Sequence, residues 1–361
     1  MSRYIALVLA ASLLSACNND LDINADYKDI TVVYGLLNQR DSVHFVKINK
    51  AFLGEGNALD MALVADSNEY SGEAISLAQV ELLDGSGNVT ATYPLRDTLI
   101  TNREPGLFNA PEQKLYYFTT PFVTTINDIR LYLQQDSKYR LKLVVKGQEI
   151  TSTTPIANNF TFPGTTVDTV NQNSRVALRN AFGTAYNDYS FNWNSRADNK
   201  RFEVTYRFRF DEVTGTDTVH LAYEQSLGTR VTANSAQNQE LTVNMSGESF
   251  YSGLATFCKS RPNWSSVDKR IFRGLDFLVT AANDDFHTYL TLTEPVSGII
   301  EDRPAYSNVN GALGIWGSRY NKNVQGKRLS QTSLQELLDG PYTFELRFCS
   351  ALDPGGSFSC N

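Results

Sequence analysis

The sequence predicts a mainly β protein, with an N-terminal Ig-like or transthyretin-like β-sandwich followed by a second β-rich domain that carries a few short helices. Three observations support this fold class. Short runs of alternating apolar and polar residues recur along the chain. Glycine-rich and asparagine-rich turns separate them, as in DGSGN at residues 84–88. Apolar residues at helical spacing occur only in a few isolated segments.

The first 16 residues indicate a secretory signal peptide. Arg3 supplies a positive charge, and the apolar run over residues 4–14 is too short to span a bilayer. The tetrapeptide LSAC that ends at Cys17 matches a bacterial lipobox, in which the cysteine is acylated and becomes the new N-terminus. Cys17 is therefore the predicted lipid anchor. Each buried methylene of its acyl chains contributes about 0.8 kcal/mol, so the anchor would be stable without a transmembrane helix.

Residues 17–28 form a predicted polar tether, and the rest of the chain is predicted to be soluble. After the signal peptide, no apolar run approaches the roughly 18 residues that a membrane-spanning helix needs. The formal net charge is −7, with acidic and basic residues interspersed. This charge pattern argues against nucleic acid as a partner.

The N-terminal sandwich is predicted over residues 29–156. Its first hairpin joins 30–37 to 42–52, where Val43 and Phe45 share one face and Val46 and Ile48 the other. Residues 54–72 form a polar insertion with a weakly helical patch at 58–64, which we expect to be a place for contacts. The other predicted strands are 78–83, 89–95, 115–118, 139–145 and 149–155.

A linker is predicted at residues 157–164, followed by the second domain over 165–361. The run RFEVTYRFRFD at 201–211 alternates most regularly, with aromatics on one face and arginines on the other. We interpret the aromatics as core and the arginines as a solvated or cross-strand-paired face, rather than as a nucleic-acid or glycan surface. Helices are expected at 246–259 and 283–290, the second capped by Asn283.

A third helix is expected near residue 333. Ser333 and Glu336 fit a capping box, Gly340 stands at the expected C-terminal position, and Pro341 prevents continuation. The alternating run at 342–348 predicts a final strand.

The sequence contains no recognisable catalytic or metal-binding motif. Its three histidines, His44, His220 and His287, form no pair at ligand spacing. Asp284 and Asp285 lie close to His287, but acids in the first turn of a helix are expected to compensate the helix dipole rather than to bind a cation. Nucleophile elbows and phosphate-binding loops are also missing. We therefore predict a protein that is not an enzyme and has no cofactor.

Three cysteines remain beyond Cys17. In an oxidising compartment, one disulfide and one free thiol are expected. The pairing Cys349–Cys360 across the turn at 353–356 and the pairing Cys258–Cys349 are both allowed, and the sequence does not choose between them.

An ordered set of short motifs resembles a known family. The lipobox is followed by the strand at 30–37, LAQVELLDGSGN at 77–88, STTPI at 152–156, GESFY at 247–251, FHTYL at 286–290 and YSNVNGALGIWG at 306–317. In this order they resemble an uncharacterised Bacteroidota outer-membrane lipoprotein family that carries one domain of unknown function over nearly its whole length. The resemblance covers residues 17–350.

The resemblance implies a location and a kind of partner. Such lipoproteins are often displayed on the outer leaflet, facing the cell exterior, and carry an acidic sorting tag after the acylated cysteine. The corresponding residues are Asn18, Asn19, Asp20 and Asp22, although Leu21 separates the two acids. Family members are frequently associated with outer-membrane β-barrels such as TonB-dependent transporters. The family has no established catalytic residues, so it implies none here.

Together these observations favour a non-catalytic accessory or adaptor subunit of an outer-membrane β-barrel complex, either the barrel-assembly machinery or a TonB-dependent transporter. The alternative is a surface lipoprotein that captures a carbohydrate or another ligand. In that case an exposed Trp193, Trp264 or Trp316 would stack on sugar rings. A surface hydrolase is the third hypothesis.

Overall fold

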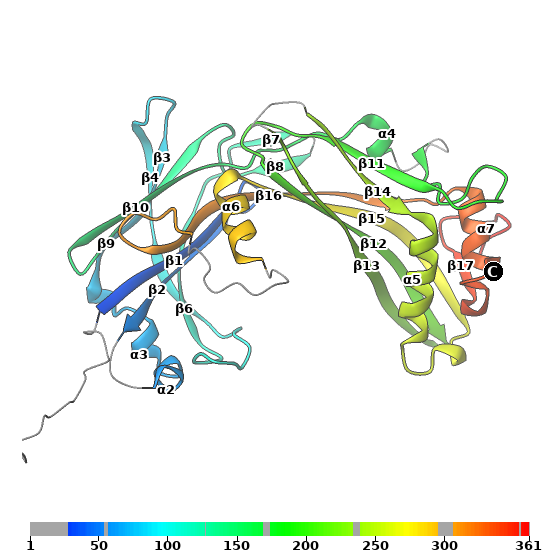
Figure 1. Ribbon diagram of the computed structural model, residues 1–361, viewed down its shortest axis with the longest axis horizontal. Helices are drawn as coiled ribbons and strands as arrows, with labels where there is room; N and C mark the ends of the chain where they lie inside the picture. Colours follow the sequence, from blue (N-terminus) through cyan, green and yellow to red (C-terminus); the bar gives the residue numbers. More distant parts are fainter. Residues whose placement is uncertain are drawn as a thin grey trace, which may run out of the picture.

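The computed structural model describes residues 28–53, 57–126, 128–168, 174–233, 239–294, 306–353 and 355–360. The predicted signal peptide, the predicted lipid anchor Cys17 and the predicted sorting tag precede residue 28 and lie outside the described residues. Figure 1 shows an elongated molecule in which the N-terminal and C-terminal parts of the chain form two β-rich halves.

The described residues are mainly β, as predicted. The first ten strands are β1 (Lys28–Asn38), β2 (Val43–Leu53), β3 (Ile75–Leu83), β4 (Val89–Pro94), β5 (Arg96–Ile100), β6 (Gln113–Thr119), β7 (Thr124–Ile126), β8 (Ile129–Leu131), β9 (Lys138–Val145) and β10 (Gln148–Pro155). Those that follow are β11 (Asp188–Asn194), β12 (Arg201–Thr214), β13 (Asp217–Val231), β14 (Glu240–Ser246), β15 (Lys269–Ala282), β16 (Leu313–Lys327) and β17 (Phe348–Ser350). The helices are α2 (Ala58–Ala62), α3 (Ala65–Asn68), α4 (Gly164–Val167), α5 (Gly247–Lys259), α6 (Asp284–Thr293) and α7 (Gln331–Asp339).

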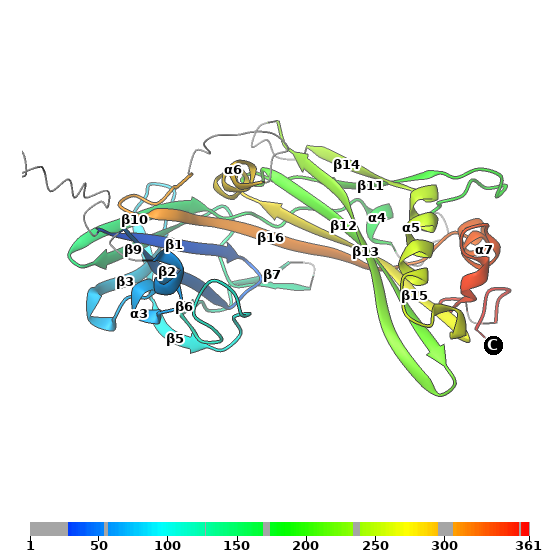
Figure 2. The ribbon, with the colours of Figure 1, turned by 60° about the horizontal axis from the view of Figure 1, so that its bottom comes forward.

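One long strand, β16, belongs to both halves. Its first part pairs in parallel with β1, from Val32↔Leu313 to Asn38↔Arg319. Its second part pairs antiparallel with β15, up to Ala282↔Arg319. A nine-stranded sheet results, with the order β13-β12-β15-β16-β1-β2-β6-β5 and with β17 beside β15. The 15 residues of β16 extend over about 50 Å, and Figure 2 shows this orange strand crossing between the halves.

The N-terminal half is a β-sandwich. The β16-β1-β2-β6-β5 end of the large sheet faces a second sheet of order β10-β9-β3-β4. Alternate residues of the two sheets fill the space between them, for example Val33 and Val46 on one side and Leu141 and Leu143 on the other, all fully buried. The expected strands and hairpins of this half are confirmed.

Trp316 of β16 fixes how this sandwich closes. The residue is fully buried, and its Nε1–H donates to the carbonyl of Tyr139 in β9 at 2.9 Å. Gly35 in β1 is its register partner, and a Cβ built on Gly35 would lie 2.6 Å from the indole ring. Only a glycine therefore leaves room for the tryptophan at this position.

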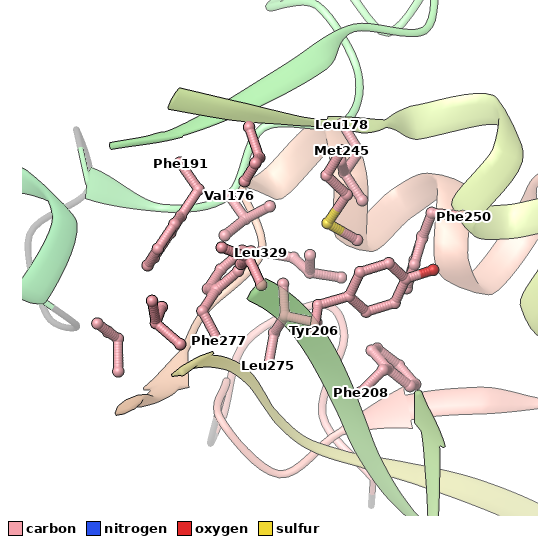
Figure 3. Packing of buried hydrophobic residues seen from close by; sticks show 14 of the residues in the cluster. Val176, Leu178, Phe191, Tyr206, Phe208, Met245, Phe250, Leu275, Phe277 and Leu329 are labelled. Atoms are coloured by element: carbon pink, nitrogen blue, oxygen red, sulfur yellow. The ribbon is translucent and has the colours of Figure 1, made fainter. Parts of the chain in front are cut away.

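The C-terminal half encloses the larger apolar core. The aromatic face of β12, predicted from alternation, is buried along its length: Phe202, Val204, Tyr206, Phe208 and Phe210 are at most 1% exposed. Side chains from the two-stranded β11-β14 sheet, α5 and α7 cover this face. Figure 3 shows Tyr206 and Phe208 packing beside Phe250 of α5.

The predicted linker begins as a buried crossing between the halves. Ala157 and Asn158 are fully inaccessible, and the Asn158 N–H donates to Asn199 Oδ1 at 2.7 Å. Lys322 of β16 donates from Nζ to Asn159 Oδ1 at 2.9 Å and to the Phe160 carbonyl at 2.5 Å. Burial lowers the pKa of Lys322 to about 8. The domain boundary at 157–164 stays a prediction.

Helix α7 begins earlier than expected. The N-cap is Ser330, whose side chain accepts from the Ser333 N–H, and not Ser333 itself. Ser333 is fully buried, and its Oγ accepts from the Leu178 N–H at 2.8 Å. Glu336 is drawn away from a capping role, because it accepts from the Tyr186 hydroxyl at 2.6 Å and pairs with Arg179. Both residues of the predicted capping box therefore bond to distant parts of the chain instead of capping the helix.

The final strand predicted at 342–348 is wrong over most of its length. Residues Phe344–Leu346 form a 3-10 turn, and strand β17 begins only at Phe348. The N–H groups of Thr343 and Phe344 both donate to the Gly340 carbonyl, which coils the chain directly after α7. Phe344 is consequently 58% exposed although alternation places it with the buried Leu346.

We predict that Gly35→Ala destabilises the fold by about 1–3 kcal/mol, because the added methyl group overlaps the buried indole of Trp316. The free energy of unfolding from urea denaturation provides the measurement. Gly72→Ala is the matched control, since a Cβ at Gly72 meets nothing within 4 Å. Equal stability losses in the two variants would contradict the steric explanation.

Candidate functional site

The outer face of the N-terminal sheet exposes apolar side chains from three neighbouring strands. Tyr34 of β1 is 45% exposed, Phe45 and Val43 of β2 are 49% and 38% exposed, and Leu313 of β16 is 43% exposed. We call these four residues the aromatic face. Their strand neighbours Val33, Val46 and Ile48 fill the sandwich core, so the alternation places this set on the opposite surface.

Helix α6 converts one border of the aromatic face into a groove. It packs on β16, and its Tyr289 meets Tyr34 edge to face with ring centroids 6.4 Å apart. The groove has a volume of about 380 Å³, and its lining includes Tyr34, Phe45, Phe286 and Tyr289. Figure 1 shows α6, in yellow, beside β1 and β16.

The fully buried Asn283 fixes the position of α6. As the predicted N-cap, its Oδ1 accepts from the Phe286 N–H, and the same oxygen accepts from the Ser318 N–H of β16. Its Nδ2 donates to Thr154 Oγ1 of β10 at 2.7 Å. One side chain therefore ties the helix to both sheets of the sandwich.

Asp285, in the first turn of α6, contributes to this packing. Asp285 accepts hydrogen bonds from Thr154 and from the Tyr306 hydroxyl, each at 3.2 Å. His287 lies on the same helix, as expected, and burial lowers its pKa. Within the described ranges, no group of three or more His, Cys, Asp or Glu side chains is arranged to hold a metal ion.

His44 lies in the wall of the groove and is nearly inaccessible. Its Nε2 is 3.0 Å from Thr120 Oγ1, and its ring stacks on Phe118 at 4.7 Å between centroids. Burial lowers the pKa of His44 to about 4, because no carboxylate compensates for the loss of hydration. The imidazole is therefore neutral at physiological pH.

The arginines of β12 lie opposite its aromatic core and are paired as predicted. Arg207 forms an ion pair with Glu224 of β13 at 2.6 Å. Arg209 forms one with Asp276 of β15 at 2.7 Å. Both arginines stay about 40% exposed.

Two of the described cysteines are bonded to each other and the third is free. Cys349 and Cys360 form a disulfide, which is one of the two pairings that the sequence allows. Cys258 is a free, buried cysteine of α5. Burial raises its pKa to about 12, so the thiol is not activated for nucleophilic chemistry.

Two of the three tryptophans considered for stacking on sugars are inaccessible. Trp193 and Trp316 are fully buried, because their rings fill the two cores. Trp264 is partly buried, and the Lys259 ammonium lies 5.4 Å from its ring centroid.

Comparison with models of known protein families and with the sequences of curated proteins gives no match. The resemblance to the Bacteroidota lipoprotein family therefore stays a prediction. Among the helices that the structure describes, none is both long enough and apolar enough to cross a membrane.

Sequence reasoning did not identify the aromatic face as a candidate site, although part of the signal was present. Val43 and Phe45 share one face of a strand whose other face, with Val46 and Ile48, is also apolar. A strand that is apolar on both faces indicates either a fully buried strand or a contact surface. Only the exposure of Phe45 decides between them.

We predict that His44 makes the fold sensitive to acid. Since its pKa is about 4 in the folded state and ordinarily 6.5, the unfolded chain binds the proton more strongly between these values. His44 thus stabilises the fold above pH 6.5, and this contribution, about 3 kcal/mol in full, is lost as the pH falls toward 4. Denaturant unfolding at several pH values measures the loss.

His44→Gln is expected to flatten this dependence while it keeps a side chain that can bond Thr120. Val43→Gln, at the neighbouring exposed position, is the control and should keep the wild-type pH profile. A His44→Gln profile identical to that of the wild type would contradict the assignment.

Proposed function

We propose that this chain is an outer-membrane lipoprotein, anchored through Cys17 and facing the cell exterior, that serves as a non-catalytic accessory subunit of an outer-membrane β-barrel complex. The barrel partner is either a TonB-dependent transporter or the barrel-assembly machinery. The observation that carries the proposal is the aromatic face with its bordering groove. Exposed apolar side chains in the half that carries a predicted membrane anchor favour a protein partner in the same membrane.

The length of the tether limits where that partner can be. Lys28, the first residue of β1, follows Cys17 by 11 residues. A chain of that length spans at most about 40 Å when fully extended. If Cys17 is acylated, the start of β1 stays within this distance of the membrane surface. Tyr34 lies six residues further along this strand, about 20 Å from its start, so the aromatic face belongs to the half of the molecule that carries the predicted anchor.

The composition of the aromatic face suits a protein contact. Tyrosine and phenylalanine are enriched at the centres of interfaces, where they bury much area with little loss of conformational entropy. The adjoining groove of about 380 Å³ has room for side chains of a partner. Tyr34 and Tyr289 already contact each other, which restricts their rotamers before binding.

We predict that Phe45→Ser combined with Leu313→Ser reduces the recovery of a barrel protein with the tagged chain at least tenfold. Both side chains are more than 40% exposed, so the variant is expected to fold while its contact surface loses two apolar groups. Affinity purification from detergent-solubilised outer membranes, with quantitative mass spectrometry, measures the effect.

Phe182→Ser is the matched control, because Phe182 is 87% exposed and lies between α4 and β11, in the other half of the chain. This variant should retain the partner. Purification of the wild-type chain as a monomer, without any barrel protein, would contradict the proposal. If the double variant still retains the barrel protein, the contact does not depend on the aromatic face.

We predict that Cys17→Ser abolishes labelling by an acyl-chain precursor and releases the chain from the membrane fraction, because the anchor depends on the acylated thiol. The variant with Asp20→Asn and Asp22→Asn is the matched control. It keeps the cysteine and should stay in the membrane, while its accessibility to protease on intact cells falls if the tag directs surface display. Unchanged membrane association of Cys17→Ser would exclude the anchor.

A further inference from the structure

A second concave surface lies on the C-terminal half, far along the sequence from the aromatic face. Arg207 and Arg209 of β12, Arg273 of β15 and His220 of β13 line a groove of about 770 Å³ together with Asp211. We call these five residues the arginine groove. They occupy the outer face of the sheet whose inner face forms the large aromatic core.

Buried carboxylates hold two of the arginines in place. Arg209 donates from Nε and Nη2 to the two oxygens of Asp276 at 2.7 and 3.1 Å, and Asp276 also accepts from the Gly326 N–H. Asp211 accepts from Arg273 Nε at 2.7 Å through Oδ2. The side chains of both acids are at most 5% exposed. The guanidinium positions are therefore set by the fold rather than by solvent.

Asp211 also orients the histidine. Its Oδ1 lies 2.7 Å from His220 Nδ1, which leaves Nε2 on the solvent side of a ring that is 83% exposed. Burial alone would raise the pKa of Asp211, but the hydrogen bonds from His220 and Arg273 outweigh it and lower the pKa. Asp211 thus stays charged and keeps both neighbours aligned.

The carboxylates use only part of the donor capacity of the arginines. A guanidinium has five N–H donors, and the bonds to Asp276, Asp211 and Glu224 engage Nε of each arginine and one Nη2. The three side chains remain 39–44% exposed, so their other donors face solvent. The groove consequently offers unused donors beside its two buried carboxylates, and one exposed carboxylate, Glu224, also lines it next to Arg207.

The shape of the groove indicates the size of a ligand. The small side chains of Ala222 and Ala351 leave space between the charged residues, and Leu352 adds an apolar border. The volume falls in the range of small-molecule sites. Arg207 and Arg209 are separated by one residue on a strand, so their backbones lie about 7 Å apart on one face.

We propose that the arginine groove binds a small organic anion that carries at least two carboxylate, phosphate or sulfate groups. Two such groups would accept from neighbouring guanidiniums in the paired geometry that arginine prefers, while the frame of the ligand lies along Ala222 and Leu352. This site is independent of the proposed contact with a barrel protein, because it uses other strands and the opposite half of the molecule.

Isothermal titration of the full mature chain in detergent tests the proposal with two probes. Trigalacturonate presents carboxylates on a sugar frame, and inositol hexakisphosphate presents phosphates on a ring. Neutral maltotriose is the uncharged control. Saturable binding of either anionic probe, without binding of maltotriose, supports the site, and the preferred probe identifies the anionic group.

Two variants with exposed partners separate binding from folding. Arg207→Gln is expected to weaken the preferred probe about tenfold, because one charged contact is lost. Glu224→Gln is expected to strengthen it about two- to fivefold, since Arg207 no longer shares its charge with an exposed carboxylate. A purely structural ion pair would not produce this gain in affinity.

Arg196→Gln is the matched control, because Arg196 also pairs with an exposed acid, Asp136, but lies outside the groove. It should change the affinity less than twofold. Equal weakening by Arg196→Gln and Arg207→Gln would reduce the effect to general electrostatics and overturn the site. Failure of both anionic probes to bind saturably would overturn it as well.

Discussion

The two halves of this protein depend on the pairing of one strand, β16, with two different partners. Its first residues bond in parallel to β1, and its last residues bond antiparallel to β15. Trp316 fills the N-terminal core, while Tyr320 and Val324 of the same strand fill the C-terminal core. Loss of β16 would therefore open both cores at once, which couples the two halves in folding and in stability.

Buried polar groups around this strand set the relation between the halves. Ser318, Asn283 and Lys322 are each at most 8% exposed, and each bonds to a residue between Thr154 and Phe160. A buried ammonium such as that of Lys322 is costly, and its acceptors here are neutral. Such networks specify one arrangement because any shift leaves a buried group unsatisfied. The position of α6 follows from the same bonds.

The same sheet thus presents two chemically different outer surfaces. Near β1 and β2 the exposed side chains include the aromatic and aliphatic groups of the aromatic face, which suit contact with another protein. Near β12 and β15 they are arginines held by buried acids, which suits an anionic small molecule. In both places the inner face supplies stability, and the outer face carries one of the two proposed contacts. The two proposed contacts can therefore coexist on one molecule.

The sequence by itself determined the local features: the β class, the hairpins, the inward aromatics of β12 and the Asn283 cap, because alternation and turn chemistry act over a few residues. Only the tertiary structure decided the parallel pairing of β1 with β16, the choice of Cys360 as the partner of Cys349 and the exposure of Phe45. The pairing of β1 with β16 joins residues far apart in the chain. The disulfide and the exposure of Phe45 depend on how the surrounding elements pack, which no local pattern encodes. Trp316 is buried for the same reason, since Gly35 makes its space from a distant strand.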